Sequence, residues 1–151
     1  MAISQIIAIV VASLVMGVLW GPWVGLTRSI AAFEPDALLV IVGRLSRNLA
    51  PLMTVLMPAA LLSMIPVLIL TFGGHPAAFG LTLAAFALFT VALAVTLAIE
   101  VPIVAQIESW TPQTLPGNWQ QLRDRWVSFH LLRVIPSIAG LTLLVIGAVR
   151  F

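Results

Sequence analysis

Two long stretches without a charged side chain limit what this sequence can fold into. Residues 2–27 are uncharged, and so are residues 48–99, which are enough for two membrane crossings. A helix needs roughly 20 apolar residues to cross about 30 Å of hydrocarbon. A third uncharged stretch, residues 134–149, makes a fourth crossing if its helix begins earlier. These runs of Leu, Ala and Val do not alternate with polar residues, as the strands of a membrane barrel would.

The sequence therefore predicts an all-α integral membrane protein, a single four-transmembrane-helix bundle over residues 1–151. We expect spans at about residues 3–26, 49–72, 78–107 and 126–149, in a multi-pass protein of the cell membrane. The composition agrees, because 62% of the residues are hydrophobic and only 8% are charged, too few to cover a soluble core. No cation precedes Arg28, so we interpret the first span as a retained helix and not as a cleaved signal peptide.

Several kinds of chemistry are excluded by the residue types present. The chain has no cysteine, which excludes disulfides, thiolate catalysis and Cys-based metal sites. Its net charge of +2 is too small to indicate binding to nucleic acid. His75 and His130 are expected on opposite faces of the membrane, so one chain cannot ligate a haem with two histidines. We expect no metal and no cofactor.

The distribution of arginine predicts how the bundle is oriented. With four spans both termini lie on one side, which holds only Arg150, while the other six arginines fall on the opposite side. Positively charged loops stay in the cytoplasm. We therefore expect both termini on the non-cytoplasmic side.

Small residues recur every four positions along the first span, at Ser13, Gly17, Gly21 and Gly25. Such a face lets membrane helices approach each other closely. We expect it to pack inside the bundle; the alternative is that Gly17, Gly21 and Gly25 form a contact between copies in a homo-oligomer.

The second span contains three prolines, at Pro51, Pro58 and Pro66. Prolines are tolerated in membrane helices where neighbouring groups satisfy the freed backbone carbonyls. We expect a bent or locally opened helix. Residues 35–47, just before this span, are either a separate interfacial helix or the first turns of the same helix.

Polar side chains gather at one end of the predicted bundle. Ionisable groups inside a membrane cost several kcal/mol unless they are paired or hydrated, and they are functional candidates by default. Glu100 is the most informative, since the helix before it is apolar back to Gly80. His130 and Arg133 reach the same depth on the antiparallel neighbour, so we expect Glu100 to pair with one of them.

Four of these residues recur at helical spacing just before the last uncharged stretch, and the same face continues into two small residues. They are Arg123, Trp126, His130 and Arg133, followed by Ser137 and Gly140. We expect this stripe to face inward and to line a pocket with Glu100. The alternatives are an arginine surface layer, interfacial tryptophans and an ion pair that only locks two helices.

The segment "EVPIVAQIESWTPQTLPGNWQQLRDRWVSFHLLRVIPSIAG" resembles the anthrone oxygenase-like membrane proteins. In that family the third helix ends in an Asn-Val-Pro-Ile-Asn-like motif, followed by a Trp, a Pro-rich loop, an Arg-x-x-Trp element and His-x-x-Arg. The segment "RLSRNLAPLM" is also similar. Glu100 and Val104 stand where the family motif has asparagines. The resemblance implies oxidation of anthrones to anthraquinones without a classical cofactor, as known for members in polyketide pathways.

Two hypotheses of function follow. In the first, the protein is a membrane oxidoreductase that acts on a lipophilic aromatic or quinone-like small molecule. Glu100 or His130 removes a proton, and Arg133, with Arg47, stabilises the resulting anion. Asn48 and Trp126 orient the ring. In the second, the protein is a non-catalytic membrane protein that binds a lipid or a partner protein, or a small transporter subunit, and its polar cluster is structural.

Overall fold

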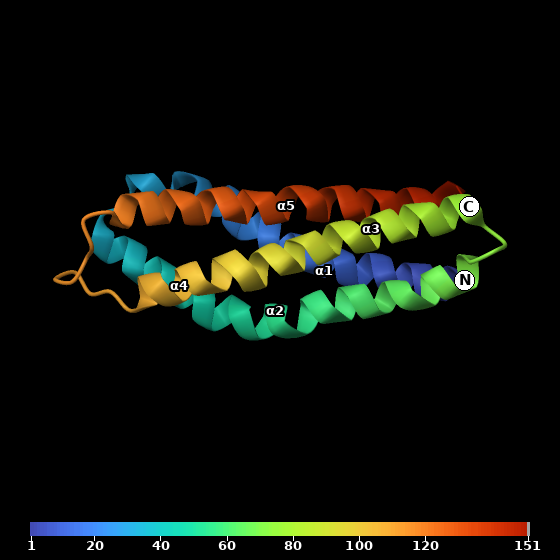
Figure 1. The fold of residues 1–151 in the computed structure, drawn as a ribbon, viewed down its shortest axis with the longest axis horizontal. Coiled ribbons are helices and arrows are strands. Elements are labelled where there is room, and N and C mark those ends of the chain that lie inside the picture. Colours follow the sequence, from blue (N-terminus) through green and yellow to red (C-terminus); the bar gives the residue numbers. More distant parts are fainter. Residues whose placement is uncertain (151) are drawn as a thin grey trace.

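The computed structural model describes residues 1–150 and is helical throughout that range apart from short connections (Figure 1). Phe151, the last residue of the predicted domain, lies outside the described residues. The elements are α1 (Ala2–Gly25), the 3-10 helix η1 (Thr27–Ala32), α2 (Pro35–Thr71), α3 (Pro76–Val95), the π-helix η2 (Thr96–Glu100), α4 (Val101–Glu108) and α5 (Trp119–Arg150). They form four continuous helical segments, each long and apolar enough to cross a membrane. The predicted fold class is confirmed.

The four segments run side by side along the long axis of the molecule (Figure 1). Both termini and the short turn between α2 and α3 lie at one end, and the two longer connections lie at the other. This arrangement is what an even number of crossings requires. Which end faces the cytoplasm stays a prediction from the arginine distribution.

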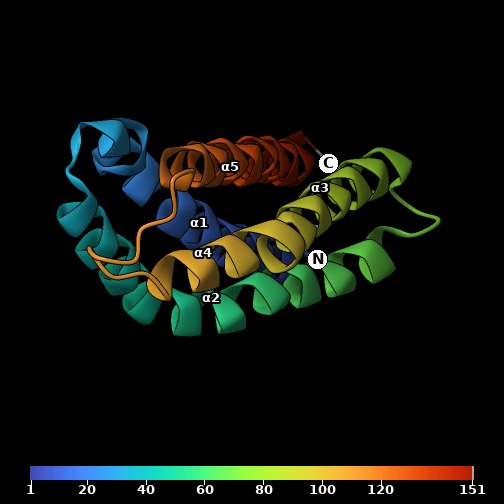
Figure 2. The same ribbon diagram turned by 60° about the vertical axis from the view of Figure 1, so that its left-hand side comes forward.

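Two helices begin well before the predicted spans. The second starts at Pro35 and the fourth at Trp119, so residues 35–47 are the first turns of α2 and not a separate interfacial helix. Pro35 occupies the first turn, where its missing N–H has no partner to lose, and Asp36 follows it near the positive end of the helix dipole. Beyond this start α2 remains α-helical through all three of its prolines and takes a bowed course (Figure 2). The expected bend is therefore spread over the helix.

The break in helical geometry falls in the third segment instead. At η2 the N–H of Val101 donates to the carbonyl of Thr96, five residues back, where an α-helix would use four. Pro102 explains the widening, because its ring has no N–H and would clash with the carbonyl of Ala98 in a regular turn. This short π-helix ends at Glu100, which is buried.

The face of α1 that packs inside the bundle is formed by Ala8, Ala12, Val15 and Leu19. The predicted packing of Gly17, Gly21 and Gly25 inside the bundle is wrong. These glycines are exposed, and a Cβ placed on any of them would meet no atom within 4 Å. The reason is rotational: Ala12, Val15 and Leu19 belong to a different face of the helix, and burying that one turns the glycines outward.

Close helix contact occurs between α3 and α5. A Cβ on Gly140 would lie 2.9 Å from two ring carbons of Phe89, so only glycine lets the ring pack there. The predicted inward stripe on α5 is confirmed, since Trp126, His130 and Ser137 are buried along it. Two apolar clusters form the core, one toward the termini around Phe89 and one toward the long loops around Trp126. The buried ionisable residues Glu100, His130 and Arg133 come at the sequence positions where each helix passes from one cluster to the other.

Candidate active site

A cavity of about 440 Å³ lies among all four helical segments. Its walls are mostly apolar, and its polar side chains converge from different helices: Thr27, Ser46, Thr54, Thr96, Glu100, Glu108, Trp126, His130 and Arg133. Small-molecule pockets span about 300–1,000 Å³ and combine an apolar lining with a few placed polar groups. The cavity has the size and the chemistry of a small-molecule site.

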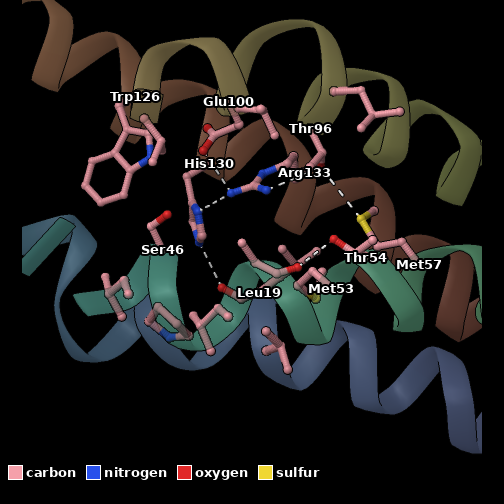
Figure 3. A pocket seen from close by; sticks show the side chains of 18 of the residues that line it. Leu19, Ser46, Met53, Thr54, Met57, Thr96, Glu100, Trp126, His130 and Arg133 are labelled. Atoms are coloured by element: carbon pink, nitrogen blue, oxygen red, sulfur yellow. Dashed lines mark hydrogen bonds and ion pairs between the residues drawn. The ribbon is translucent and has the colours of Figure 1, made fainter. Parts of the chain in front are cut away.

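Arg133 is the centre of the polar group (Figure 3). Its Nη2 donates to Glu100 Oε2 at 2.9 Å and lies 2.7 Å from His130 Nδ1. Its Nη1 donates to Thr96 Oγ1 at 3.3 Å. The predicted pairing of Glu100 with Arg133 is confirmed, and both side chains are buried, with 3% and 11% of their surface exposed. Thr96, one turn before Glu100, is a partner that the sequence analysis missed.

The partners of His130 fix which ring nitrogen carries its proton. A guanidinium can only donate, so His130 Nδ1 accepts from Arg133. The proton then resides on Nε2, which donates to the backbone carbonyl of Leu19 on α1 at 2.9 Å. Both nitrogens are thus occupied. In this arrangement His130 ties Arg133 to α1 and has no free lone pair to take a proton.

Three buried polar atoms in residues that line the cavity have no hydrogen-bond partner within the described chain. They are Glu100 Oε1, Arg133 Nε and Thr27 Oγ1. A buried polar group left without a partner costs about 1–3 kcal/mol. The site therefore holds one carboxylate oxygen, one guanidinium N–H and one hydroxyl without a partner within hydrogen-bond distance, and the Trp126 indole N–H is, besides Arg133, the protein donor that acts on the Glu100 carboxylate. The indole of Trp126 lies beside the carboxylate and is tilted 58° to the His130 ring at 6.4 Å (Figure 3).

Two of the predicted substrate-binding residues lie elsewhere. Arg47 and Asn48 are exposed, and neither lines the main cavity. Arg47 donates to its own Gly43 carbonyl at 3.1 Å and borders a smaller surface hollow instead. Because α2 is one continuous helix, its neighbours Leu45, Ser46 and Leu49 take the inward positions.

Two other arginines of α5 do not line the main cavity: Arg123 is buried next to the Trp119 ring, and Arg125 is exposed. Arg123 pairs with the adjacent Asp124 at 2.7 Å, and Arg125 lies 5.5 Å from the centre of the Phe129 ring. Within residues 1–150, no three His, Cys, Asp or Glu side chains come together in a way that could hold a metal ion.

A family model for anthrone oxygenase matches residues 44–143, about two thirds of the sequence. The chain belongs to the anthrone oxygenase family. Neither a curated protein nor a solved structure matches it significantly. In this anthrone oxygenase family member the matched region contains Glu100, Trp126, His130 and Arg133, while Leu19 and Thr27 lie on the segment before it. It is a membrane protein of that family, and its buried polar group lies at the cavity.

A carboxylate next to a guanidinium in an apolar pocket can take part in two kinds of chemical step. The carboxylate can accept a proton from a substrate placed beside it. The guanidinium can stabilise negative charge as it develops on a substrate oxygen, an effect that is strong where water is excluded. This chain thus presents a carboxylate and a guanidinium within one hydrogen-bonded cluster at the cavity.

Proposed function

We propose that the protein is a membrane oxidoreductase that converts a lipophilic aromatic ketone of the anthrone type into the corresponding quinone, with molecular oxygen as the oxidant. One observation carries the proposal: Glu100 is buried at the cavity, and its Oε1 has no hydrogen-bond partner in the protein. A carboxylate oxygen in that state is available to a substrate proton. Membership of the anthrone oxygenase family supports the same reaction class.

Glu100 takes the role of general base in this scheme. It removes one proton from the ring CH₂ group, and the electron pair moves onto the carbonyl oxygen across the ring. His130 is not the base, because both of its nitrogens are already bonded. Its part is to hold Arg133 in position.

Arg133 stabilises the enolate that forms. Its Nε–H has no partner in the protein, so it can donate to the new oxyanion while Nη2 keeps its bonds to Glu100 and His130. Trp126 forms a flat apolar surface beside Glu100 against which an aromatic ring can pack.

The remaining steps balance with oxygen alone. The carbanionic carbon adds to O₂, and return of the proton from Glu100 gives a hydroperoxide at that carbon. Loss of the second C–H proton breaks the O–O bond and releases water, which leaves a second ring carbonyl. The CH₂ group and one O₂ thus become one C=O and one H₂O.

The test measures oxygen uptake and quinone absorbance in proteoliposomes supplied with anthrone, above the rate in protein-free vesicles. We expect one O₂ consumed per anthraquinone formed. Glu100→Gln keeps an acceptor for Arg133 but removes the base, and it should lower turnover at least about 100-fold, the lower range for loss of a general base.

The matched control is Glu34→Gln, which changes an exposed carboxylate at the start of α2 and should leave turnover unchanged. Thermal unfolding of both variants shows whether they fold. Absence of turnover in the unmodified protein, or full turnover in Glu100→Gln, would contradict the proposal. Binding of anthrone without oxidation would instead support a non-catalytic binding protein.

A further inference from the structure

The main cavity is bordered on one side by residues that also face outward. On α2 these are Ala50, Thr54 and Pro58, and on η2 and α4 they are Leu97, Val101 and Ala105. All six are exposed, and Leu97 and Val101 have 62% and 53% of their surface free. The cavity is only partly enclosed, and the exposed residues of its lining mark the side on which it is open. We call the opening between these two rows the slot.

The two rows of the slot match in length and position. Each covers nine residues, with eight steps between its ends, and each repeats every four residues, so each is one face of a helix. At 1.5 Å per residue the slot extends about 12 Å along the helices. Glu100 lies between Leu97 and Val101, so the slot opens beside the candidate site.

The six side chains that form the slot are uncharged. The single hydroxyl among them, on Thr54, donates to the Ala50 carbonyl at 2.8 Å. Both rows lie within helices long and apolar enough to cross a membrane. Toward Pro58 and Leu97 the slot lies in the uncharged parts of both helices, where a molecule that passes through meets no unsatisfied polar group until it reaches Glu100 and Arg133. The other end of the slot, at Ala105, is one turn from Glu108, which is exposed and also lines the cavity.

We propose that the cavity is loaded sideways from the bilayer through this slot, and that its ligands include aromatic ketones and quinones bearing a long apolar chain. This inference rests on the proposed function, since it takes the aromatic ring as the part that enters. The ring sits at the polar group, and the chain stays in the lipid through the slot. Such a chain adds little to the affinity of the ligand, because it remains in hydrocarbon before and after binding. A ligand that carries the chain should nevertheless bind, because the slot leaves room for it.

The experiment uses the absence of native cysteine to place a single fluorescent label. Leu97→Cys puts a bimane at the slot. Ile135→Cys puts the same label on α5 at an exposed residue outside the cavity lining, with 57% of its surface free, and is the matched control. Both proteins are reconstituted in phosphatidylcholine vesicles. The quenchers are 9,10-anthraquinone and the same ring with an octadecyl chain, both dosed as mole fraction in the bilayer.

Saturable quenching of the Leu97→Cys label by both compounds is expected, with half-saturating mole fractions within about threefold of each other. The Ile135→Cys label should show only quenching that rises linearly, from collisions in the lipid. Linear quenching at both labels, or saturation by the unsubstituted ring alone, would overturn the slot, since a closed pocket of this volume excludes the longer molecule.

The outcome for the slot is separable from that for the enzyme. Saturable quenching by both compounds without anthrone turnover leaves the slot standing and refutes the proposed reaction. Turnover of anthrone together with saturable quenching by the unsubstituted ring alone supports the proposed reaction and refutes the slot.

Discussion

Replacing Glu100 with leucine should destabilise the bundle more than replacing Glu100 and Arg133 together. The single change leaves a guanidinium that is 11% exposed without its carboxylate partner. A guanidinium cannot lose its proton in a protein, so the charge stays. Breaking a buried pair in this way costs about 3–5 kcal/mol.

The double change removes both charges and leaves an apolar contact. Replacement of a whole buried pair by well-packed apolar residues is often neutral or stabilising. The cost that remains is at His130, whose Nδ1 loses its donor, and an unpaired buried acceptor costs about 1–3 kcal/mol. The double variant should therefore be about 2 kcal/mol more stable than Glu100→Leu alone, or roughly 4–8 °C in Tm for a chain of this length.

Arg133→Leu alone should fall between the two. It leaves a buried carboxyl, which can take up a proton and become neutral, an escape that the guanidinium does not have. The double variant should therefore be the most stable of the three, Arg133→Leu should be intermediate, and Glu100→Leu should be the least stable.

The assay is thermal unfolding in detergent followed by near-UV circular dichroism, with SDS titration as a second measure. Arg125→Leu is the control, because this exposed arginine only lies over Phe129 and its loss should change stability by less than about 1 kcal/mol. Equal stability of Glu100→Leu and the unmodified protein, or a double variant whose loss is the sum of the two single losses, would refute the reasoning.

Four further outcomes are expected. Gly140→Ala should cost about 1–3 kcal/mol because its Cβ would overlap an aromatic ring, whereas Gly147→Ala, whose Cβ would be at ordinary contact distance, should not lower Tm; equal Tm values would contradict this. Gly21→Leu should leave Tm unchanged because nothing lies near its Cβ, and a smaller particle in light scattering would show that this face joins copies of the chain. His130→Gln, which can both accept and donate, should retain more anthrone turnover than His130→Ala, and equal loss in both would argue against a positioning role. A reporter enzyme fused to the C-terminus should be active on the non-cytoplasmic side, and cytoplasmic activity would reverse the orientation.

The four crossings and the central ion pair could be predicted because each depends on a large energetic effect that can be seen in a short stretch of sequence. Uncharged runs of this length have few other folds available, and a carboxylate in the middle of one needs a partner at the same depth. Arg133 was such a partner on the neighbouring helix. The inward stripe on α5 followed from its continuation into Ser137 and Gly140.

The rotation of individual helices could not be predicted in the same way. Small residues every four positions serve equally well for contacts within a bundle and between bundles, so Gly17 and Gly21 gave no sign of facing outward. Arg47 and Asn48 were placed at the site because they lie at the right depth. A helix turns about 100° per residue, and one position separates Arg47 on the outside from Ser46 at the cavity.

Other parts of the site had only weak signals. Thr96 resembles any membrane threonine that bonds to its own backbone, which it also does, at 2.8 Å to Ala92. Its spacing of four residues from Glu100 was the one clue. The partner of His130 on α1 is a backbone carbonyl, and no residue type at Leu19 could have revealed it.

The π turn at η2 affects which insertions the sequence of this protein can accommodate. A residue inserted into an α-helix rotates everything beyond it by about 100°. A π turn absorbs the insertion locally, so α3 keeps its packing on α5 and α4 keeps its packing on α2. Glu100 lies in that absorbing turn. The carboxylate of Glu100 thus occupies the one turn of this segment in which an extra residue fits without changing the packing of the helices on either side.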